Sequence, residues 1–500
     1  MSEHFISRDD AERDLLAAAA YLGESITSSD GHAEAMLAVV PMYLERGEVD
    51  VAAELANTVD DPFTRDKLLT VVAEKCAEID DDEYALQLAD AIEDEGLRSK
   101  AFELIGIKKA SAGQIDKARA IAAEITHPDA VVSAIAVSCA ASGDWAGASE
   151  AVGELEFPTD RVHTLLELAA SAVRGGQTEI AAEKLDEAAT AADEIEHREE
   201  KIRSLIEIGE HFIEASRNDL AIAVLDTAKR AAEALDNVHR DNFLAAISLG
   251  FLRAGSPDFS SRSLDLIGDK TQEASCLLGR AREQWRREQH DEALASLEES
   301  CAVLRSQREA ETRNTKAKMA LFGSIAVQFA GFGKGERAIE IAQGIEYEGE
   351  RDEALTQIAS LLTAEGEDER ARDALRSMPD DASRAFALIV MSDAKEKRNE
   401  RVAALEMLDE AMHLVDAVPQ LTLRSNAYNE IARRLSNYGE TARAADVAAM
   451  NLSTIMSVRD ESSRVTLLTA LSASPTAAAI GRESYLNSGL DGLLAAASRG

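Results

Sequence analysis

The segment IGIKKASAGQIDKARAIA, residues 105–122, contains the pattern that decides the fold. A small residue, Gly106, is followed seven positions later by Gly113 and twelve positions later by Ala118. Apolar residues three and four positions apart place an apolar stripe on each of two helices. Glycine between them permits the left-handed backbone that ends the first helix, and the small residues allow the helices to cross closely. The segment therefore predicts a helical hairpin.

The same spacing recurs along the chain, and the residue at the first small position is termed the anchor of its repeat. The anchors are Val40, Ala73, Gly106, Ala136, Ala169, Gly209, Ser248, Ala281, Ala326, Ala359, Ser392 and Ala432. The residues twelve positions later are Ala52, Ala85, Ala118, Ala148, Ala181, Ala221, Ser260, Ala293, Ala338, Ala371, Ala404 and Ala444. Each hairpin buries its apolar stripe only by stacking on neighbouring hairpins. The sequence therefore predicts an all-α fold, a right-handed α-solenoid of about twelve stacked helical hairpins.

A turn residue follows the anchor at a fixed distance of seven positions. Glycines fill this position in most repeats: Gly47, Gly113, Gly143, Gly176, Gly255, Gly333, Gly366 and Gly439. Asp80 and Asn399 replace glycine in two repeats, and both residue types tolerate a left-handed backbone. In the eighth repeat the position is occupied by Glu288, which departs from the pattern. We expect the first helix of each hairpin to end at this position.

The anchor, the turn and the later alanine resemble the tetratricopeptide repeat. A second clear example is IASLLTAEGEDERARDAL at residues 358–375. The resemblance covers about residues 30–455, although the aromatic positions of the family are mostly aliphatic in this chain and several repeats are longer than usual. It implies binding of a protein or peptide on a concave face, and it names no partner. We expect an N-terminal helical cap over residues 1–30, a repeat array over 31–458 and C-terminal helices over 459–500.

Charge and composition exclude several classes of protein. The chain has 53 Lys and Arg residues against 92 Asp and Glu residues, a net charge of −39 that repels nucleic-acid phosphate. No apolar stretch is long enough for membrane insertion. The N-terminal segment lacks the features of a secretory signal, and the four cysteines form no disulfide framework. We therefore expect a cytoplasmic protein that does not bind nucleic acid.

The acidic residues are spread over the whole chain, which suggests adaptation to a saline cytoplasm, as in a halophile. An ordinary acidic protein is the alternative interpretation. Raising the salt concentration from about 0.01 to 1 M shortens the Debye length from roughly 30 to 3 Å and screens the repulsion among these charges. We therefore predict that the Tm, measured by circular dichroism, rises with salt. A Tm that does not depend on salt would contradict the saline interpretation.

The sequence contains no motif that supports catalysis. It lacks HExxH, GxSxG and zinc-ligand spacings, and GFGKGE at residues 331–336 does not match a phosphate-binding loop. We predict a non-enzymatic scaffold or adaptor, without cofactor or metal, that binds a protein or peptide along the solenoid surface. One alternative is a structural subunit that self-associates through its terminal repeats. A ligand sensor or enzyme without a recognisable motif is a further alternative.

One repeat departs from the pattern in a way that suggests a binding site. Arg280 stands directly before its anchor, where the other repeats have an aliphatic residue. The same helix also contains Arg282, Trp285, Arg286 and Arg287. The surrounding segment has nine basic and eight acidic residues within an otherwise acidic chain. This hairpin is interpreted either as internally salt-bridged or as a site for acidic or phosphorylated partner segments, with the Trp side chain as an anchor.

A second candidate site consists of polar residues on the first helix of the last repeat. Asn426, Asn429 and Arg433 are spaced three and four positions apart, so they share one helix face. The set resembles the polar clamp that some tetratricopeptide domains use for peptide carboxylates, although only one helix carries it. We expect this face to line the groove of the solenoid.

Basic residues also recur eight positions before most anchors, near the start of each first helix. They are Arg65, Arg98, Arg161, Lys201, Arg240, Lys318, Arg351, Arg384 and Arg424. The helix macrodipole disfavours a cation at the N-terminal end of a helix, so another interaction must hold these side chains. We expect ion pairs with carboxylates of neighbouring repeats. A binding surface is the alternative.

Overall fold

The computed structural model describes residues 4–307, 315–477, 480, 484 and 487–497. Every secondary-structure element in these residues is a helix, and none is a strand. Within this part of the chain, no helix combines the length and apolar character that a membrane span requires. The chain forms two compact units, one made of residues 1–102 and 352–500 and the other of residues 103–351. The all-α prediction is confirmed.

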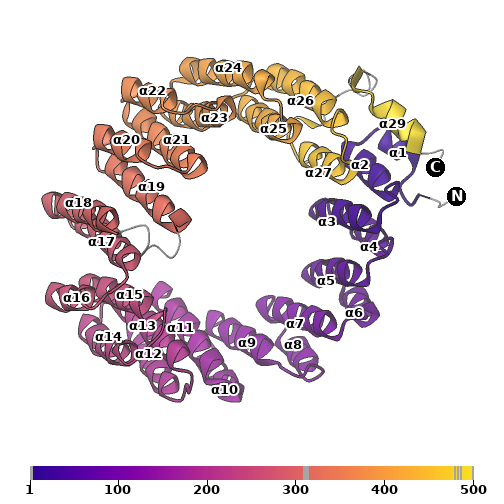
Figure 1. The fold of residues 1–500 in the computed structure, drawn as a ribbon. Coiled ribbons are helices and arrows are strands. Elements are labelled where there is room, and N and C mark those ends of the chain that lie inside the picture. Colours follow the sequence, from indigo (N-terminus) through magenta and orange to yellow (C-terminus); the bar gives the residue numbers. More distant parts are fainter. Residues whose placement is uncertain (1–3, 308–314, 478–479, 481–483, 485–486, 498–500) are drawn as a thin grey trace. The chain divides into compact units, whose positions relative to one another are not determined.

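The helices are labelled in Figure 1. The first unit contains α1 (Arg8–Ala11), α2 (Leu15–Glu24), α3 (Ser29–Glu45), α4 (Val49–Asn57), α5 (Pro62–Glu78), α6 (Asp82–Ala91), α22 (Asp368–Arg376), α23 (Asp381–Lys397), α24 (Arg401–Ala417), α25 (Leu421–Asn437), α26 (Thr441–Met456), α27 (Glu461–Ser472) and α29 (Leu490–Ala497). The second unit contains α8 (Ile115–Ala122), α9 (Asp129–Ala141), α10 (Trp145–Glu154), α11 (Pro158–Arg174), α12 (Thr178–Asp193), α13 (Arg198–Glu214), α14 (Asn218–Glu233), α15 (Arg240–Arg253), α16 (Pro257–Leu264), α17 (Lys270–Arg286), α18 (His290–Ser306), α19 (Thr315–Gly331) and α20 (Gly335–Gln343). The chain passes from one unit to the other within α7 (Glu95–Ser111) and α21 (Glu348–Glu365).

Consecutive helices pack as antiparallel hairpins, as the repeat predicts. Examples are α9 with α10, α11 with α12 and α17 with α18 in the second unit, and α23 with α24 in the first. Ser248 of α15 donates a hydrogen bond to the carbonyl oxygen of Ser260 of α16 at 2.8 Å, so the anchor and the residue twelve positions later meet where these helices cross. Buried apolar residues of the second unit form one core cluster from Ala110 to Cys276. The hairpins are consistent with a tetratricopeptide-like repeat.

The turn residues have the left-handed backbone that the sequence predicts. The predicted positions with positive φ are Gly47, Asp80, Gly113, Gly143, Gly176, Gly255, Glu288, Gly333, Gly366, Asn399 and Gly439. Ser216, which lies seven positions after its anchor, also has a positive φ of 58°. An L-residue in this region costs roughly 1–2 kcal/mol, so glycine is favoured at this position by the backbone itself.

Glu288 offers a direct test of the cost of this backbone conformation. Its φ is 61°, so we expect Glu288→Gly to raise the free energy of unfolding by about 1 kcal/mol. Gly47 has a φ of 78° and no heavy atom within 4 Å of an added Cβ. We expect Gly47→Ala to lower stability by a similar amount through the backbone alone. Urea unfolding of both variants measures the two effects, and a destabilised Glu288→Gly would contradict the explanation.

Helices from the two ends of the chain, α2 and α3 and α27 and α29, pack against each other within the first unit. α27 contacts α2 and α3 as well as α25 and α26 (Figure 1), and α29 contacts α2. Ser462 of α27 donates a hydrogen bond to Glu34 of α3 at 2.7 Å. A Cβ placed on Gly23 of α2 would lie 3.8 Å from Val465 Cγ1. The segments expected to be an N-terminal cap and separate C-terminal helices are therefore neighbours in the fold.

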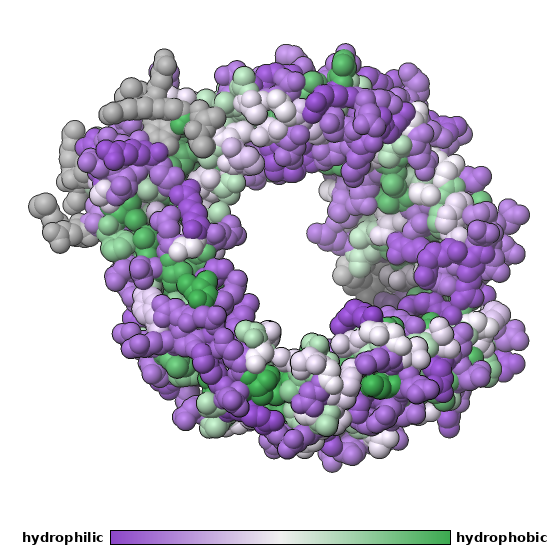
Figure 2. All heavy atoms as spheres, turned by 180° about the vertical axis from the view of Figure 1, so that it is seen from behind, coloured by the Kyte–Doolittle hydropathy of each residue, from purple (hydrophilic) through white to green (hydrophobic). Residues whose placement is uncertain are grey.

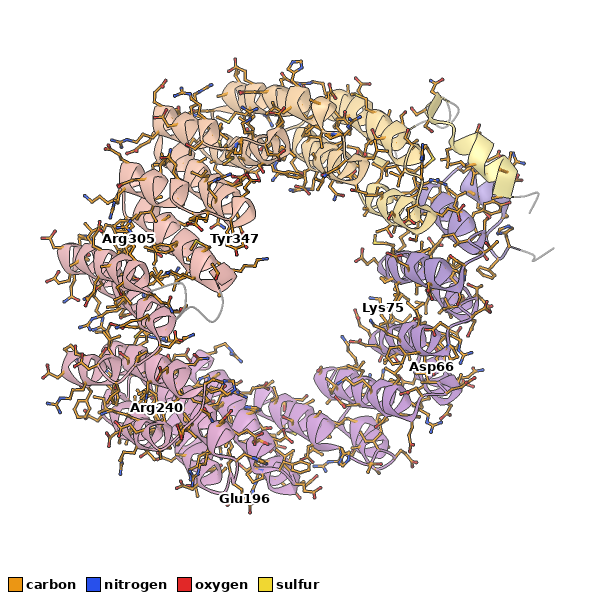
Figure 3. All side chains as sticks on the ribbon, viewed as in Figure 1. Asp66, Lys75, Glu196, Arg240, Arg305 and Tyr347 are labelled. Atoms are coloured by element: carbon orange, nitrogen blue, oxygen red, sulfur yellow. The ribbon has the colours of Figure 1, made fainter. Side chains whose placement is uncertain are left out.

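Basic residues at the start of first helices interact with the ends of second helices. Arg240, labelled in Figure 3, donates a hydrogen bond to the carbonyl oxygen of Leu266, just after α16, at 3.1 Å. Lys201 Nζ lies 2.9 Å from Asp193 Oδ1 at the end of α12. The C-terminal end of a helix carries partial negative charge, which explains why cations are favourable at this edge of the hairpins. Both carbonyl oxygens and carboxylates serve as partners, whereas the expectation from the sequence was ion pairs with carboxylates.

Candidate functional site

The arginine-rich hairpin that the sequence singles out consists of α17 and α18. Arg280 is half-buried and donates a hydrogen bond to Ser261 Oγ at 3.1 Å. Arg287, which caps the C-terminus of α17, donates to Glu283 Oε1 at 2.7 Å and to the carbonyl oxygen of Leu252 at 2.8 Å. These two arginines therefore connect α17 to the preceding hairpin, and they have a structural role.

Arg282 and Arg286 are exposed on α17, and their partners are Gln328 of α19 and Glu283 of the same helix rather than residues of the preceding hairpin. Arg282 Nε donates to Gln328 Oε1 of α19 at 2.6 Å. Arg286 forms an ion pair with Glu283, and its side chain is 70% exposed. Arg282 is held by an amide rather than a carboxylate, and the partner of Arg286, Glu283, is buried although the arginine itself is exposed. Both guanidinium groups are therefore accessible to another ligand.

Trp285 lies between these two arginines along α17. Its indole ring stacks on Phe332, with ring centroids 3.9 Å apart and an interplanar angle of 9°. The ring also contacts His290, at a centroid distance of 4.2 Å. The indole is therefore half-buried against its own unit. The role of these five side chains in partner binding stays a prediction.

The polar set on α25 is held in part by neighbouring side chains. Asn429 Oδ1 accepts a hydrogen bond from Asn451 of α26 at 2.7 Å. Arg433 donates to Glu430 Oε2 at 2.8 Å, and Asn426 is exposed. The three residues share one helix, as expected, and their role as a clamp stays a prediction.

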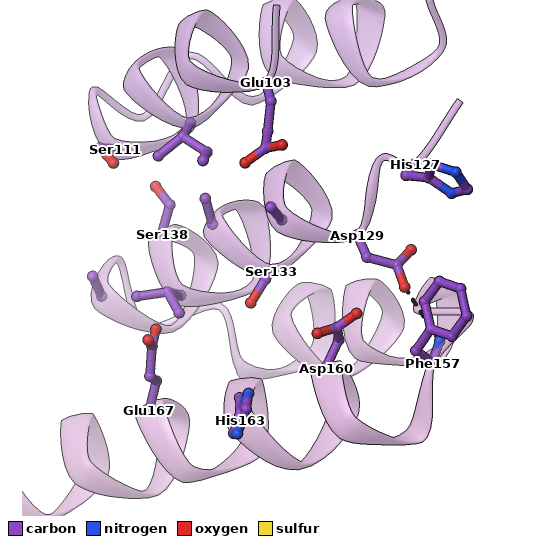
Figure 4. Close-up of a pocket in the computed structure, with 15 residues that line it drawn as sticks. Glu103, Ser111, His127, Asp129, Ser133, Ser138, Phe157, Asp160, His163 and Glu167 are labelled. Atoms are coloured by element: carbon purple, nitrogen blue, oxygen red, sulfur yellow. Dashed lines mark hydrogen bonds between the residues drawn. The ribbon is translucent and has the colours of Figure 1, made fainter. Parts of the chain in front are cut away.

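A groove that the sequence analysis did not predict lies in the second unit between α7, α9 and α11 (Figure 4). Its volume is about 770 Å³, and we term it the α9 groove. Glu103 of α7 and Asp160 of α11 project toward α9, which lies between these helices, and Glu167 lies two turns farther along α11 (Figure 4). First helices of three successive hairpins thus form one open surface.

The groove exists because α9 presents small side chains to its floor. Ala130, Ala134, Val137 and Ala141 follow one another at helical spacing along this face of the helix. Neighbouring first helices carry larger residues, such as Ile107 of α7. α9 is also shorter than α7 and α11, with 13 residues against 17 in each. Ser133 and Ser138 of α9 also line the groove, so its floor consists of small residues and is mainly apolar.

Asp129 fixes one end of the groove. The carboxylate is buried, and its Oδ2 accepts hydrogen bonds from the backbone N–H groups of Glu156 and Phe157, at 3.1 and 3.2 Å. These bonds hold the loop before α11 and leave the Phe157 side chain 44% exposed beside the groove. Ser133 and Thr164 form a 2.5 Å hydrogen bond between α9 and α11. The wall formed by α11 is therefore held in place by polar contacts.

The same loop-binding aspartate recurs in other hairpins. Asp66, labelled in Figure 3, accepts hydrogen bonds from the N–H groups of Glu93 and Asp94 at 2.9 and 2.8 Å. Asp241 accepts equivalent bonds 27 and 28 positions ahead, from Gly268 and Asp269. Each of these aspartates lies seven positions before an anchor. That spacing is the signal by which the sequence could have revealed this set, although abundant Asp and Glu residues obscured it.

Charge in the α9 groove is negative. Burial raises the pKa of Asp160, and the nearby Asp129 carboxylate raises that pKa further. Among the described residues, neither Asp160 nor Glu167 has a Lys or Arg partner, and none of the lining residues is Lys or Arg. Arg161, the basic residue next to Asp160, is instead paired with Glu194 at 2.5 Å. A cation in the groove would therefore reduce repulsion between carboxylates.

The lining of the α9 groove suits association with another chain. Among the described residues, no group of three or more His, Cys, Asp or Glu side chains is placed to hold a metal ion. His163 lines the groove between Asp160 and Glu167 (Figure 4), and its Nε2 lies 3.7 Å from Oε2 of Glu207, which is not a lining residue. An apolar floor between carboxylates suits an amphipathic chain with basic side chains.

Comparisons with known proteins find no matching family model and no matching curated protein. Similar solved structures include a protein from Thermococcus onnurineus NA1, with 18% sequence identity and a TM-score of 0.26, over 71% of this chain and 98% of that one. The signal transduction ATPase with a tetratricopeptide repeat sensor from Pyrococcus horikoshii has 12% identity and a TM-score of 0.27, over 63% of this chain and 55% of that one. An APC/C hetero-tetramer has 14% identity and a TM-score of 0.22, over 87% of this chain and 89% of that one. The repeat fold rests on the hairpins described above.

Proposed function

We propose that this chain is a non-enzymatic scaffold or adaptor that binds a protein or peptide partner on the surface formed by its first helices. The observation that carries the proposal is the α9 groove, which three successive hairpins build from an apolar floor and polar walls. Grooves that combine an apolar surface with a few polar groups are typical binding sites. The four cysteines are all unpaired, which supports a cytoplasmic location.

A second surface for partners is proposed on α17, where Arg282 and Arg286 are exposed beside Trp285. Much of the remaining surface is hydrophilic (Figure 2), and the chain as a whole is strongly acidic. Acidic or phosphorylated partner segments would therefore be attracted to this helix and repelled by most other regions.

The test of this surface is the double variant Arg282→Glu with Arg286→Glu. We expect loss of native partners in a pulldown from lysate of the source organism, with the melting curve little changed, because both side chains are exposed and Arg287 still pairs with Glu283. The control is Arg230→Glu with Arg305→Glu, an equal change of charge at exposed positions on α14 and α18. A double variant that unfolds, or one that keeps every partner, would return these arginines to a structural role.

The alternative of a subunit that assembles through its terminal repeats has less support. α27 already covers α2 and α3 within the same chain, and the apolar residues Val465 and Leu468 of α27 are buried. Assembly through these faces would first require the contact within the chain to separate.

A further inference from the structure

The α9 groove has a charge pattern that identifies the chemistry of its partner. Asp160 and Glu167 lie on the same wall, seven residues apart in α11, which corresponds to about 10.5 Å along the helix. Neither has a Lys or Arg partner among the residues that the structure describes. The residues that line the groove include carboxylates and the histidines His127 and His163 but no Lys or Arg, so no fixed positive charge of the lining neutralises these two carboxylates.

The floor of the α9 groove determines which ligand side chains can lie beside Asp160 and Glu167. Ala130, Ala134 and Val137 of α9 form a shallow apolar strip beside Ile107 of α7, and Phe157 is exposed at one end. Aliphatic side chains of a ligand would cover this strip and remove apolar surface from water. Because the residues of this strip are mostly small, they leave space in the groove for the side chains of a ligand.

We propose that the α9 groove binds a basic, extended segment of a partner protein, with Lys or Arg side chains at Asp160 and Glu167 and aliphatic side chains on the α9 floor. The inference rests on the proposed scaffold function and adds the chemical class of the partner at this site. An extended polyproline II segment advances about 3.1 Å per residue with three residues per turn. Basic residues three positions apart therefore lie on one face, at about 9 Å, which is close to the separation of the two carboxylates.

The probe that follows from this spacing is the fluorescein-labelled peptide AVRALRAVG, and the matched acidic peptide is AVEALEAVG. Fluorescence anisotropy with the full chain measures the Kd of each. We expect binding of the basic peptide, little binding of the acidic peptide, and a Kd that rises as salt increases from about 0.05 to 0.3 M, because salt screens the ion pairs.

Matched variants distinguish binding of the basic peptide in the groove from its general electrostatic attraction to an acidic chain. Asp160→Asn with Glu167→Gln should raise the Kd at least tenfold. Glu179→Gln with Asp186→Asn removes the same charge from exposed positions on α12 and should leave the Kd within twofold. Equal effects of the two double variants, or equal binding of the two peptides, would overturn the proposal.

A second pair of variants tests the floor without a change of charge. Ala134→Phe fills the groove and should weaken binding of the basic peptide at least tenfold, whereas Ala146→Phe places the same side chain on the exposed face of α10 and should not. Circular dichroism confirms that each variant is folded. If Ala134→Phe binds the peptide as the unchanged chain does, the proposed site is wrong.

The peptide-binding assay and the pulldown together test the groove inference and the scaffold function separately. A chain that recovers native partners from lysate but does not bind AVRALRAVG would overturn the groove inference and leave the scaffold function standing. A chain that binds the peptide through the groove but recovers no partner from lysate would contradict the scaffold function instead.

Discussion

Val465→Asp is expected to destabilise both ends of the chain at once. Val465 is 1% exposed on α27, where it lies beside Gly23 of α2. A carboxylate at this position would be buried without a partner, so we expect the loss of about 3 kcal/mol or more of local stability. Hydrogen exchange measured by mass spectrometry should become faster in α2 and α3, although these helices are far from residue 465 in sequence.

The control for this substitution is Ala470→Asp, which places the same charge at an exposed position of α27. We expect little change in exchange for this variant, because surface substitutions usually change stability by less than about 0.5 kcal/mol. If Val465→Asp accelerates exchange in α25 and α26 but leaves α2 protected, the contact between the chain ends does not hold the first unit together.

Leu225→Ala is the second substitution with a large expected effect. Leu225 of α14 is 0% exposed. Its side chain fills the space left by two glycines, because an added Cβ would lie 2.9 Å from it at Gly209 of α13 and 3.0 Å at Gly250 of α15. Truncation to alanine leaves a cavity among three helices, and we expect the free energy of opening to fall by about 2–5 kcal/mol.

Native-state hydrogen exchange of α13, α14 and α15 measures this effect in the full chain. Val238→Ala is the control, because this residue is 62% exposed in the same unit and should change stability by less than about 0.5 kcal/mol. Equal exchange in the two variants would show that the glycine-lined space is not a tight packing site.

Local features of this fold could be predicted from the sequence, because they repeat. Turn residues such as Gly113 and Glu288 adopt positive φ at the positions that the spacing predicts. The alanines twelve positions after the anchors are buried, as at Ala118. These features depend on contacts within one hairpin, and each repeat supplies the same evidence again.

Features that depend on several hairpins could not be predicted in the same way. The α9 groove arises because one helix has small residues where its neighbours have larger ones, so no single motif marks it. The contact of α27 with α2 joins segments from opposite ends of the chain, and periodicity carries no information about such pairs. In the arginine-rich hairpin, the sequence could not show that Arg287 binds the carbonyl oxygen of Leu252.

The most direct test of the central claim is photo-crosslinking from one end of the α9 groove. A benzophenone amino acid replaces Phe157, which is 44% exposed beside the groove, or Phe63 of α5, which is 60% exposed, as the control. The full chain is irradiated in lysate of the source organism, and mass spectrometry locates the linked peptides. The account predicts links from position 157 to partner segments rich in Lys or Arg, and few such links from position 63. The same links from both positions, or links from position 157 to segments without basic residues, would contradict it.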